Sequence, residues 1–250
     1  MKKLHGTVYT VAILFMVGLT ACKKETAVLT LPKLSDYYPL QPGRVFTYRL
    51  DSTIIDPSLT QLDVISYLLK DSFGTTFNDN TGRLSYLVYR FITDTLNTQP
   101  WQPLSTYYIT PTQHSIEVVD DNNLRFIKLI DPLQDSISWS GNSYIDTKSA
   151  TSPYTYMDGW NYIYQQVNMP FTVIKGTLDS TATVLQVDAT SPPGPFDPTQ
   201  FQQRNYSVEV YAKGIGLVYK DFLCWTWDLN PYVGYVAYSY GIRLNLISVQ

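Results

Sequence analysis

The sequence predicts an all-β protein, mostly antiparallel, built as a sandwich or as a curved half-barrel sheet of about a dozen strands with little helix. Tyrosine occurs 21 times, beside many threonine and valine residues, and these residue types pack well on a pleated sheet. Short runs of alternating apolar and polar residues recur along the chain. Clusters of Asn, Asp, Gly and Pro separate these runs, as is typical of turns between strands.

Residues 1–21 have the features of a lipoprotein signal peptide. Lys2 and Lys3 precede an apolar run over 8–19. This run of about a dozen residues is shorter than the roughly 20 that a helix needs to cross a bilayer. It ends in Leu19-Thr20-Ala21-Cys22, which resembles the lipobox of bacterial lipoproteins, where the cysteine thiol receives the lipid. The alternative is an ordinary signal peptide that contains a cysteine by chance.

Lipidation of Cys22 would make the membrane the first partner of this protein. Two or three acyl chains such as palmitate, at about 0.8 kcal/mol per buried CH₂, hold a protein essentially permanently. Lys23, Lys24 and Glu25 follow the cysteine with no Asp directly after it, which resembles an outer-membrane sorting context. We therefore expect a lipid-anchored protein of the cell envelope, in the bacterial outer membrane, on its periplasmic or its surface side.

Residues 22–36 mix polar and aliphatic residues without a helical period and are expected to form the tether. Residues 37–250 show no internal repeat, which predicts a single β-rich domain. The expected strands cover, in order, 44–54, 62–71, 84–93, 106–110, 115–119, 124–130, 136–139, 160–167, 171–178, 182–187, 206–211, 216–227 and 235–247. The stretch 59–69 could instead form a short helix, and 191–198, which has four prolines, is expected to be a loop.

Two stretches of the domain resemble a known group of proteins. The first is Tyr37-Tyr38-Pro39-Leu40 with Gly43 and Tyr48, and the second is YAKGIGLVYK over 211–220. Both are similar to uncharacterised lipoproteins of the Bacteroidetes of about this length. The resemblance spans the mature chain. It implies no activity, because that family is itself unassigned.

The charge balance argues against nucleic acid as a partner. The chain has 18 basic and 21 acidic residues, and loss of Lys2 and Lys3 with the signal peptide leaves a net charge near −5. No basic run is present. A mildly acidic domain of this kind is poorly suited to bind nucleic acid, or to hold an anionic membrane by charge.

The sequence offers little for nucleophilic or metal-dependent catalysis. His5 leaves with the signal peptide and His114 stands alone in an expected turn. With Cys22 lipidated, Cys224 has no partner for an intramolecular disulfide and is expected to be a buried thiol. We assign no catalytic residue and no cofactor, and we expect a protein that is not an enzyme.

Acidic residues leave two alternatives open. Asp158, Asp221 and Asp228 lie among aromatic residues, where the carboxylates of a glycan-active hydrolase could lie. The runs 78–80 and 120–122 carry Asn and Asp that could bind calcium. Because such runs are also ordinary turn chemistry, we expect turns there and assign no metal site.

Aromatic residues are the most conspicuous candidates for binding. Flat aromatic faces hold sugars or peptides when they are exposed, although they can equally fill a sheet core. The candidate binding residues are Trp101, Trp160, Phe196, Trp225 and Trp227. The expected function is a lipid-anchored binding or accessory module that uses aromatic-rich loops to hold a glycan, peptide or envelope partner. The alternatives are a carboxylate-dependent hydrolase, a structural component, or a carrier of an apolar ligand.

Overall fold

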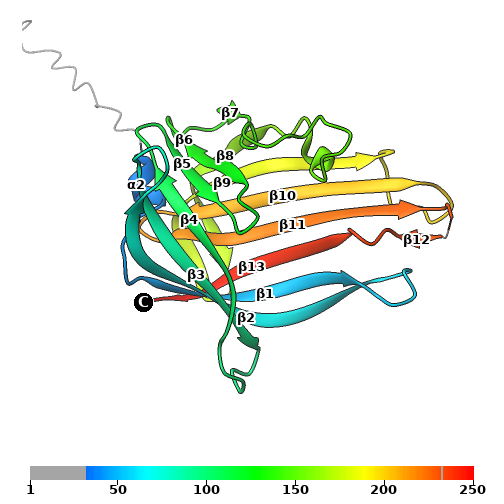
Figure 1. The fold of residues 1–250 in the computed structure, drawn as a ribbon, viewed down its shortest axis with the longest axis horizontal. Helices are drawn as coiled ribbons and strands as arrows, with labels where there is room; N and C mark the ends of the chain where they lie inside the picture. The colour runs from blue at the N-terminus through cyan, green and yellow to red at the C-terminus, as the bar shows by residue number, and fades with distance from the viewer. Residues whose placement is uncertain (1–31, 232) are drawn as a thin grey trace, which may run out of the picture. The chain divides into compact units, whose positions relative to one another are not determined.

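The computed structural model describes residues 32–231 and 233–250. The expected signal peptide and Cys22 lie outside these residues. The described chain is almost entirely antiparallel β structure, and its 13 strands form one open, curved sheet (Figure 1). The all-β prediction is therefore confirmed. Of the two architectures expected, the chain adopts the curved sheet and not the sandwich.

Most of the elements follow one another along the chain with short connections, and the longest one, over 140–161, joins β7 to β8. The strands are β1 (Val45–Ile55), β2 (Leu62–Asn78), β3 (Leu84–Asp94), β4 (Gln102–Pro111), β5 (Ser115–Val119), β6 (Arg125–Ile130), β7 (Ser138–Trp139), β8 (Tyr162–Val173), β9 (Gly176–Ser191), β10 (Gln202–Ala212), β11 (Gly216–Asp228), β12 (Gly234–Tyr235) and β13 (Tyr240–Val249). A short helix, α2 (Leu34–Tyr37), precedes β1, and a 3₁₀ turn, η2 (Thr155–Met157), follows β7.

Two series of hairpins share the sheet, and β13 joins them. The order is β6-β5-β4-β3-β2-β1-β13-β11-β10-β9-β8-β7, with β12 paired to β11. Strand β13 therefore lies between the first strand of the domain and β11. Val45 and Gln250 exchange both backbone hydrogen bonds at 2.9 Å, so the two ends of this domain meet in the middle of the sheet.

The expected Asx turns are confirmed. In the β5–β6 hairpin the Asp120 carboxylate accepts backbone N–H groups of Asn122 and Leu124, at 3.0 and 2.8 Å. Asn123 takes a positive φ of 60°, which Asn tolerates better than most residues. In the β2–β3 turn Asp79 accepts the N–H of Thr81 at 2.9 Å. These side chains replace backbone partners that the turn would otherwise leave unsatisfied.

The curvature brings the two edges of the sheet together. The Ile127 N–H on β6 donates to the Gly141 carbonyl at 2.7 Å, beyond the end of β7. The Trp139 indole on β7 donates to the Ile127 carbonyl at 2.8 Å. From β8, the Tyr164 hydroxyl contacts both the N–H and the carbonyl of Ile130 at 2.7 and 2.8 Å. These contacts protect the edge of β6, which would otherwise expose unpaired backbone groups.

Some expected boundaries were wrong. The expected strand 171–178 contains the turn between β8 and β9, because Ile174 and Lys175 lie in the turn and Gly176 takes a φ of 135°. The helix considered for 59–69 is absent. The β-branched Val64 and Ile65 lie in β2, where they pair with Thr53 and Ser52 of β1.

The folded part begins before the expected boundary at 37. Leu34 and Tyr37 are one helical turn apart in α2, and both side chains are buried, at 5 % and 0 % exposed. The Asp36 carbonyl accepts the Gly214 N–H at 2.6 Å. The last residues of the expected tether therefore belong to the fold. Within the described residues, no helix has the length and apolar character needed to cross a membrane.

Candidate functional site

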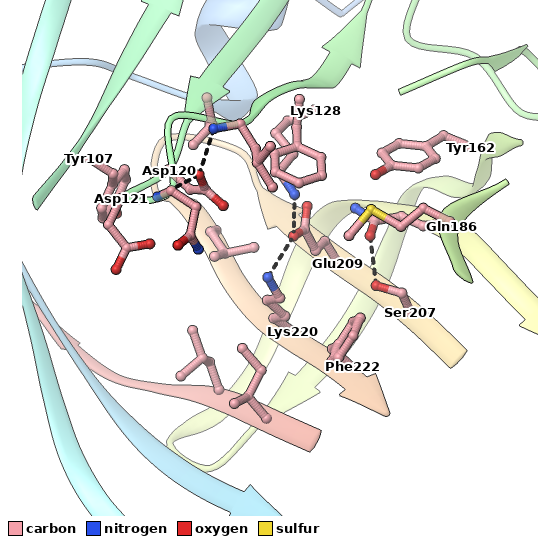
Figure 2. A pocket seen from close by; sticks show the side chains of 18 of the residues that line it. Tyr107, Asp120, Asp121, Lys128, Tyr162, Gln186, Ser207, Glu209, Lys220 and Phe222 are labelled. Atoms are coloured by element: carbon pink, nitrogen blue, oxygen red, sulfur yellow. Dashed lines mark hydrogen bonds and ion pairs between the residues drawn. The ribbon is translucent and has the colours of Figure 1, made fainter. Parts of the chain in front are cut away.

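A cavity of about 340 Å³ lies on the concave side of the curved sheet. This volume falls within the range of small-molecule binding sites. Aromatic side chains make up much of its wall; they are Tyr38, Tyr107, Phe126, Tyr154, Tyr156, Trp160, Tyr162, Tyr211, Phe222 and Tyr240. Polar and charged groups from β3, β6, β9, β10 and β11 converge on the same space (Figure 2).

Two lysines share one buried glutamate at the cavity. Glu209 on β10 is 2 % exposed, and its Oε1 lies 2.8 Å from the Nζ of Lys128 on β6 and 3.5 Å from the Nζ of Lys220 on β11. The Tyr211 hydroxyl donates to Glu209 Oε2 at 2.6 Å. We call Lys128, Glu209 and Lys220 the charge cluster; it carries one more positive than negative charge.

Strand pairing explains why the charge cluster forms. Glu209 and Lys220 are register partners in the antiparallel β10–β11 ladder, so their side chains leave the sheet on the same face. Ser207 and Phe222 form the next pair on this face. Lys128 reaches the cluster from β6 because the sheet curves.

The cluster changes the acidity of its members. Burial alone would raise the pKa of Glu209, but the neighbouring ammonium groups of Lys128 and Lys220 hold it well below the ordinary value. The pKa of Lys220 is lowered to about 8, mainly by burial and also by charge repulsion from Lys128 and Arg90. The Glu209 carboxylate offsets only part of this lowering. Lys220 is therefore a cation that Glu209 does not fully compensate.

An unpartnered amide lines the cavity beside the cluster. Gln186 on β9 is 3 % exposed, and its Oε1 accepts the Ser207 hydroxyl at 2.6 Å. This short distance is typical of an O–H donor to an oxygen, which fixes the orientation of the amide. Among the described residues, Gln186 Nε2 has no hydrogen-bond partner. A buried donor without a partner costs about 1–3 kcal/mol, so such groups call for an explanation.

A second buried ion pair borders the cavity. Arg90 on β3 makes a bidentate contact with Asp71 on β2, with both N–O distances at 2.7 Å. The Tyr107 hydroxyl donates to the same carboxylate at 2.9 Å. Asp71 is 2 % exposed. This pair is neutral as a whole and holds Arg90 in place, so it adds no net charge to the cavity.

Acidic residues of the β5–β6 turn line the other end. Asp121 and Asn122 are exposed, whereas Asp120 is half-buried and its carboxylate is engaged by its own turn. Burial raises the pKa of Asp120. Among the described residues, no group of three or more His, Cys, Asp and Glu side chains is placed to hold a metal ion. The run 78–80 forms a turn whose Asp79 carboxylate binds Thr81 and Arg83.

The structure divides the candidate aromatic residues among three places. Trp160 lines the cavity, and its ring centroid lies 6.3 Å from that of Phe222. Trp225 and Trp227 alternate with the cavity-facing residues of β11 and lie on the opposite face of the sheet. There Phe196 covers both, with centroid distances of 5.7 and 5.2 Å. Trp101 stands apart, with Lys70 Nζ 4.4 Å from its ring centroid.

Phe196 is the exposed member of that second cluster, at 45 %, whereas Trp225 and Trp227 are 9 % and 4 % exposed. The predicted loop 191–198 is confirmed over 192–198, whereas Ser191 is the last residue of β9. The Pro198 carbonyl of this loop accepts the Trp227 indole N–H at 3.1 Å. Most of this aromatic surface is therefore used to pack the loop onto the sheet.

Each of the three candidate carboxylates is engaged by groups other than a second carboxylate. Asp158 contacts Thr147 in an exposed loop, and Asp221 pairs with Arg243. Asp228 accepts backbone N–H groups of its own turn. Asp221 and Asp228 are about 23 Å apart along β11 at roughly 3.3 Å per residue, whereas glycosidase carboxyl groups are roughly 5–9.5 Å apart. His114 is exposed in the β4–β5 turn.

The charge cluster and Gln186 were not anticipated. A weak signal exists in Ser207-Val208-Glu209-Val210-Tyr211, where an acidic residue takes the inward position of a buried strand. Cys224 is a buried free thiol, as expected, and burial raises its pKa to about 11. No protein-family model matches this chain, and no curated protein matches it either.

Proposed function

We propose that this protein is a lipid-anchored binding module of the cell envelope whose curved sheet holds a small organic ligand in its cavity. The observation that carries the proposal is the combination of an aromatic-lined space of about 340 Å³ with the unpartnered amide of Gln186. Ligand sites are typically apolar clefts with a few convergent polar groups. The aromatic wall would contact the body of the ligand, and the polar groups would orient it.

The cavity favours this reading over the other hypotheses. A carrier of a purely apolar ligand would not place Lys128, Glu209 and Lys220 beside its ligand, because buried charges are costly without function or full compensation. A carboxylate-dependent hydrolase lacks support, because Asp221 is paired with Arg243 and lies too far from Asp228 along β11 to form a carboxylate pair. A glycan or peptide partner remains an alternative for the exposed ring of Phe196.

The envelope location rests on the lipobox-like sequence that ends in Cys22 and on the resemblance to Bacteroidetes lipoproteins. We expect the wild-type protein to pellet with outer membranes and the Cys22→Ser variant to be released into the soluble fraction, because the serine hydroxyl does not receive the lipid. Membrane fractionation followed by immunoblotting measures this. If the Cys22→Ser variant pelleted like the wild type, the proposed anchor would be wrong.

Ligand binding in the cavity can be tested with a neutral aromatic dye. We expect N-phenyl-1-naphthylamine to gain fluorescence with the wild-type protein, and the Ser105→Trp variant to bind it at least about tenfold more weakly. Ser105 on β4 lines the cavity, so an indole at this position would occupy the space of the dye. A loss of this size corresponds to about 1.4 kcal/mol of binding free energy.

The neighbouring residue supplies the matched control. Leu104 is 51 % exposed and does not line the cavity, so Leu104→Trp adds the same side chain outside it. We expect this variant to bind the dye as the wild type does. Equal losses in both variants, or no binding by the wild-type protein, would contradict the proposed cavity function.

A further inference from the structure

We propose that the ligand of the cavity is a small organic acid with a single anionic group, which accepts hydrogen bonds from Lys220 Nζ and Gln186 Nε2. Its apolar body lies against the aromatic wall that includes Tyr162 and Phe222 (Figure 2). This inference rests on the proposed binding function and names the chemical class of the ligand.

The charge cluster leaves Lys220 able to bind an anion. Glu209 Oε1 is already engaged by Lys128 at 2.8 Å, and Oε2 accepts the Tyr211 hydroxyl at 2.6 Å. Lys220 Nζ lies 3.5 Å from Oε1, outside the usual range of a strong charged hydrogen bond. Its ammonium has three donors, of which Glu209 engages at most one. The remaining donors are available on the side of the cavity that Lys220 lines.

The second donor points to the same ligand group. Gln186 Nε2 is buried and lacks a partner among the described residues, while its Oε1 is held by Ser207. A ligand that pairs with Nε2 must therefore offer an acceptor. An acceptor that also carries negative charge satisfies Gln186 and compensates the excess positive charge of the cluster.

Strand pairing places the two donors on the same side of the sheet. Lys220 pairs with Glu209, and Gln186 is anchored to Ser207, two residues away on β10. Gln186 and Lys220 therefore flank β10 from its two neighbouring strands, β9 and β11, and both line the cavity. A ligand that lies over β10 has one donor on each side of it.

The other charges around the cavity limit the ligand to one anionic group. Arg90 is compensated by Asp71, so it does not provide a second free cation. Asp120 and Asp121, in the turn after β5, would repel a second anionic group at the other end. The anion therefore lies toward β10 and β11, and the neutral body extends toward this turn.

Two dyes with the same skeleton test this inference. 8-Anilinonaphthalene-1-sulfonate carries a sulfonate as its single anionic group, and N-phenyl-1-naphthylamine lacks any anionic group. The measured quantity is the ratio of their affinities, obtained by fluorescence titration of each folded variant. We expect Lys220→Met to lower the sulfonate-to-neutral ratio at least about tenfold, because a charged hydrogen bond is lost. We expect Gln186→Leu to lower it about threefold or more.

Two controls separate a cavity site from a surface effect. Lys148→Met removes a lysine whose side chain is 86 % exposed and does not line the cavity, and it should leave the ratio unchanged. Lys220→Arg keeps the positive charge and should retain a higher ratio than Lys220→Met. Circular dichroism establishes that each variant is folded.

The outcomes separate this inference from the proposed function. If the neutral dye binds in the cavity but Lys220→Met and Gln186→Leu leave the ratio unchanged, the organic-acid inference is overturned and the binding function stands. If Lys148→Met lowers the ratio as much as Lys220→Met, the sulfonate binds surface charge and the inference is again overturned. If neither dye binds the wild-type protein, both proposals fail.

Discussion

Replacement of Glu209 by glutamine is expected to lower the free energy of unfolding by about 3–5 kcal/mol, because removal of one partner leaves buried charges uncompensated. Glu209 is 2 % exposed and is the carboxylate contacted by both Lys128 and Lys220. Without it, two ammonium groups face each other in a poorly solvated space. Urea unfolding monitored by tryptophan fluorescence measures the change.

The control for Glu209→Gln also removes the two lysine charges that lose their counter-ion. In a triple variant that adds Lys128→Met and Lys220→Met, the long apolar stems remain and no buried charge is unpaired. We expect this variant to recover most of the lost stability. If the triple variant were as unstable as Glu209→Gln, lost packing and not uncompensated charge would be the cause.

The unfolding free energies of the wild-type protein and of Glu209→Gln are expected to depend differently on pH. In the wild-type protein the pKa of Lys220 is lowered from 10.5 to about 8 in the folded state, so between these values the unfolded chain binds more protons. The contribution of Lys220 to stability therefore rises with pH across this window. Loss of Glu209 removes the group that raises the Lys220 pKa, so the rise should begin at lower pH.

Replacement of Asp71 by asparagine is the second change with a large expected effect, again about 3–5 kcal/mol of unfolding free energy. The carboxylate accepts two hydrogen bonds from Arg90 at 2.7 Å and one from the Tyr107 hydroxyl at 2.9 Å. Asparagine keeps the shape but removes the charge and one acceptor oxygen. Arg90 would keep its charge without a counter-ion, and chemical denaturation measures the loss.

An exposed ion pair on the same sheet provides the comparison. Asp188 pairs with Arg204, and its side chain is 53 % exposed. Because water screens exposed pairs, Asp188→Asn should cost at most about 1 kcal/mol. A loss for Asp71→Asn no larger than that for Asp188→Asn would contradict the role given to the buried pair.

Local pattern was sufficient to predict most of the fold. Alternating residues identify β1, where Phe46, Tyr48 and Leu50 are buried and the residues between them are not, because the two faces of the sheet offer different environments. The turn at Asp120 was predictable because its hydrogen bonds are formed within four residues. The β8–β9 turn was missed because Ile174 and Lys175 are not typical turn residues.

The candidate site depends on contacts that local pattern does not encode. Lys128 and Glu209 are 81 residues apart in the chain and meet only because the sheet curves. Gln186 and Ser207, 21 residues apart, are brought together by the pairing of β9 with β10. The aromatic excess was visible, but the side of the sheet on which each ring lies follows from the register. Trp225 and Trp227 therefore lie on the face opposite Lys220 and Phe222, although all four residues belong to β11.

The central position of β13 bears on the order in which the chain folds. The last strand of the domain pairs with β1 through contacts such as Phe46 with Val249, so most of the chain must be available before this ladder can form. Until then, β1 and β11 each lack a neighbour and remain open edges. Contacts between residues so distant in the chain also slow folding. Under the proposed export across a membrane from the N-terminal end, the ladders of β13 with β1 and β11 cannot form until the final strand arrives, so the two series of hairpins stay unjoined during passage.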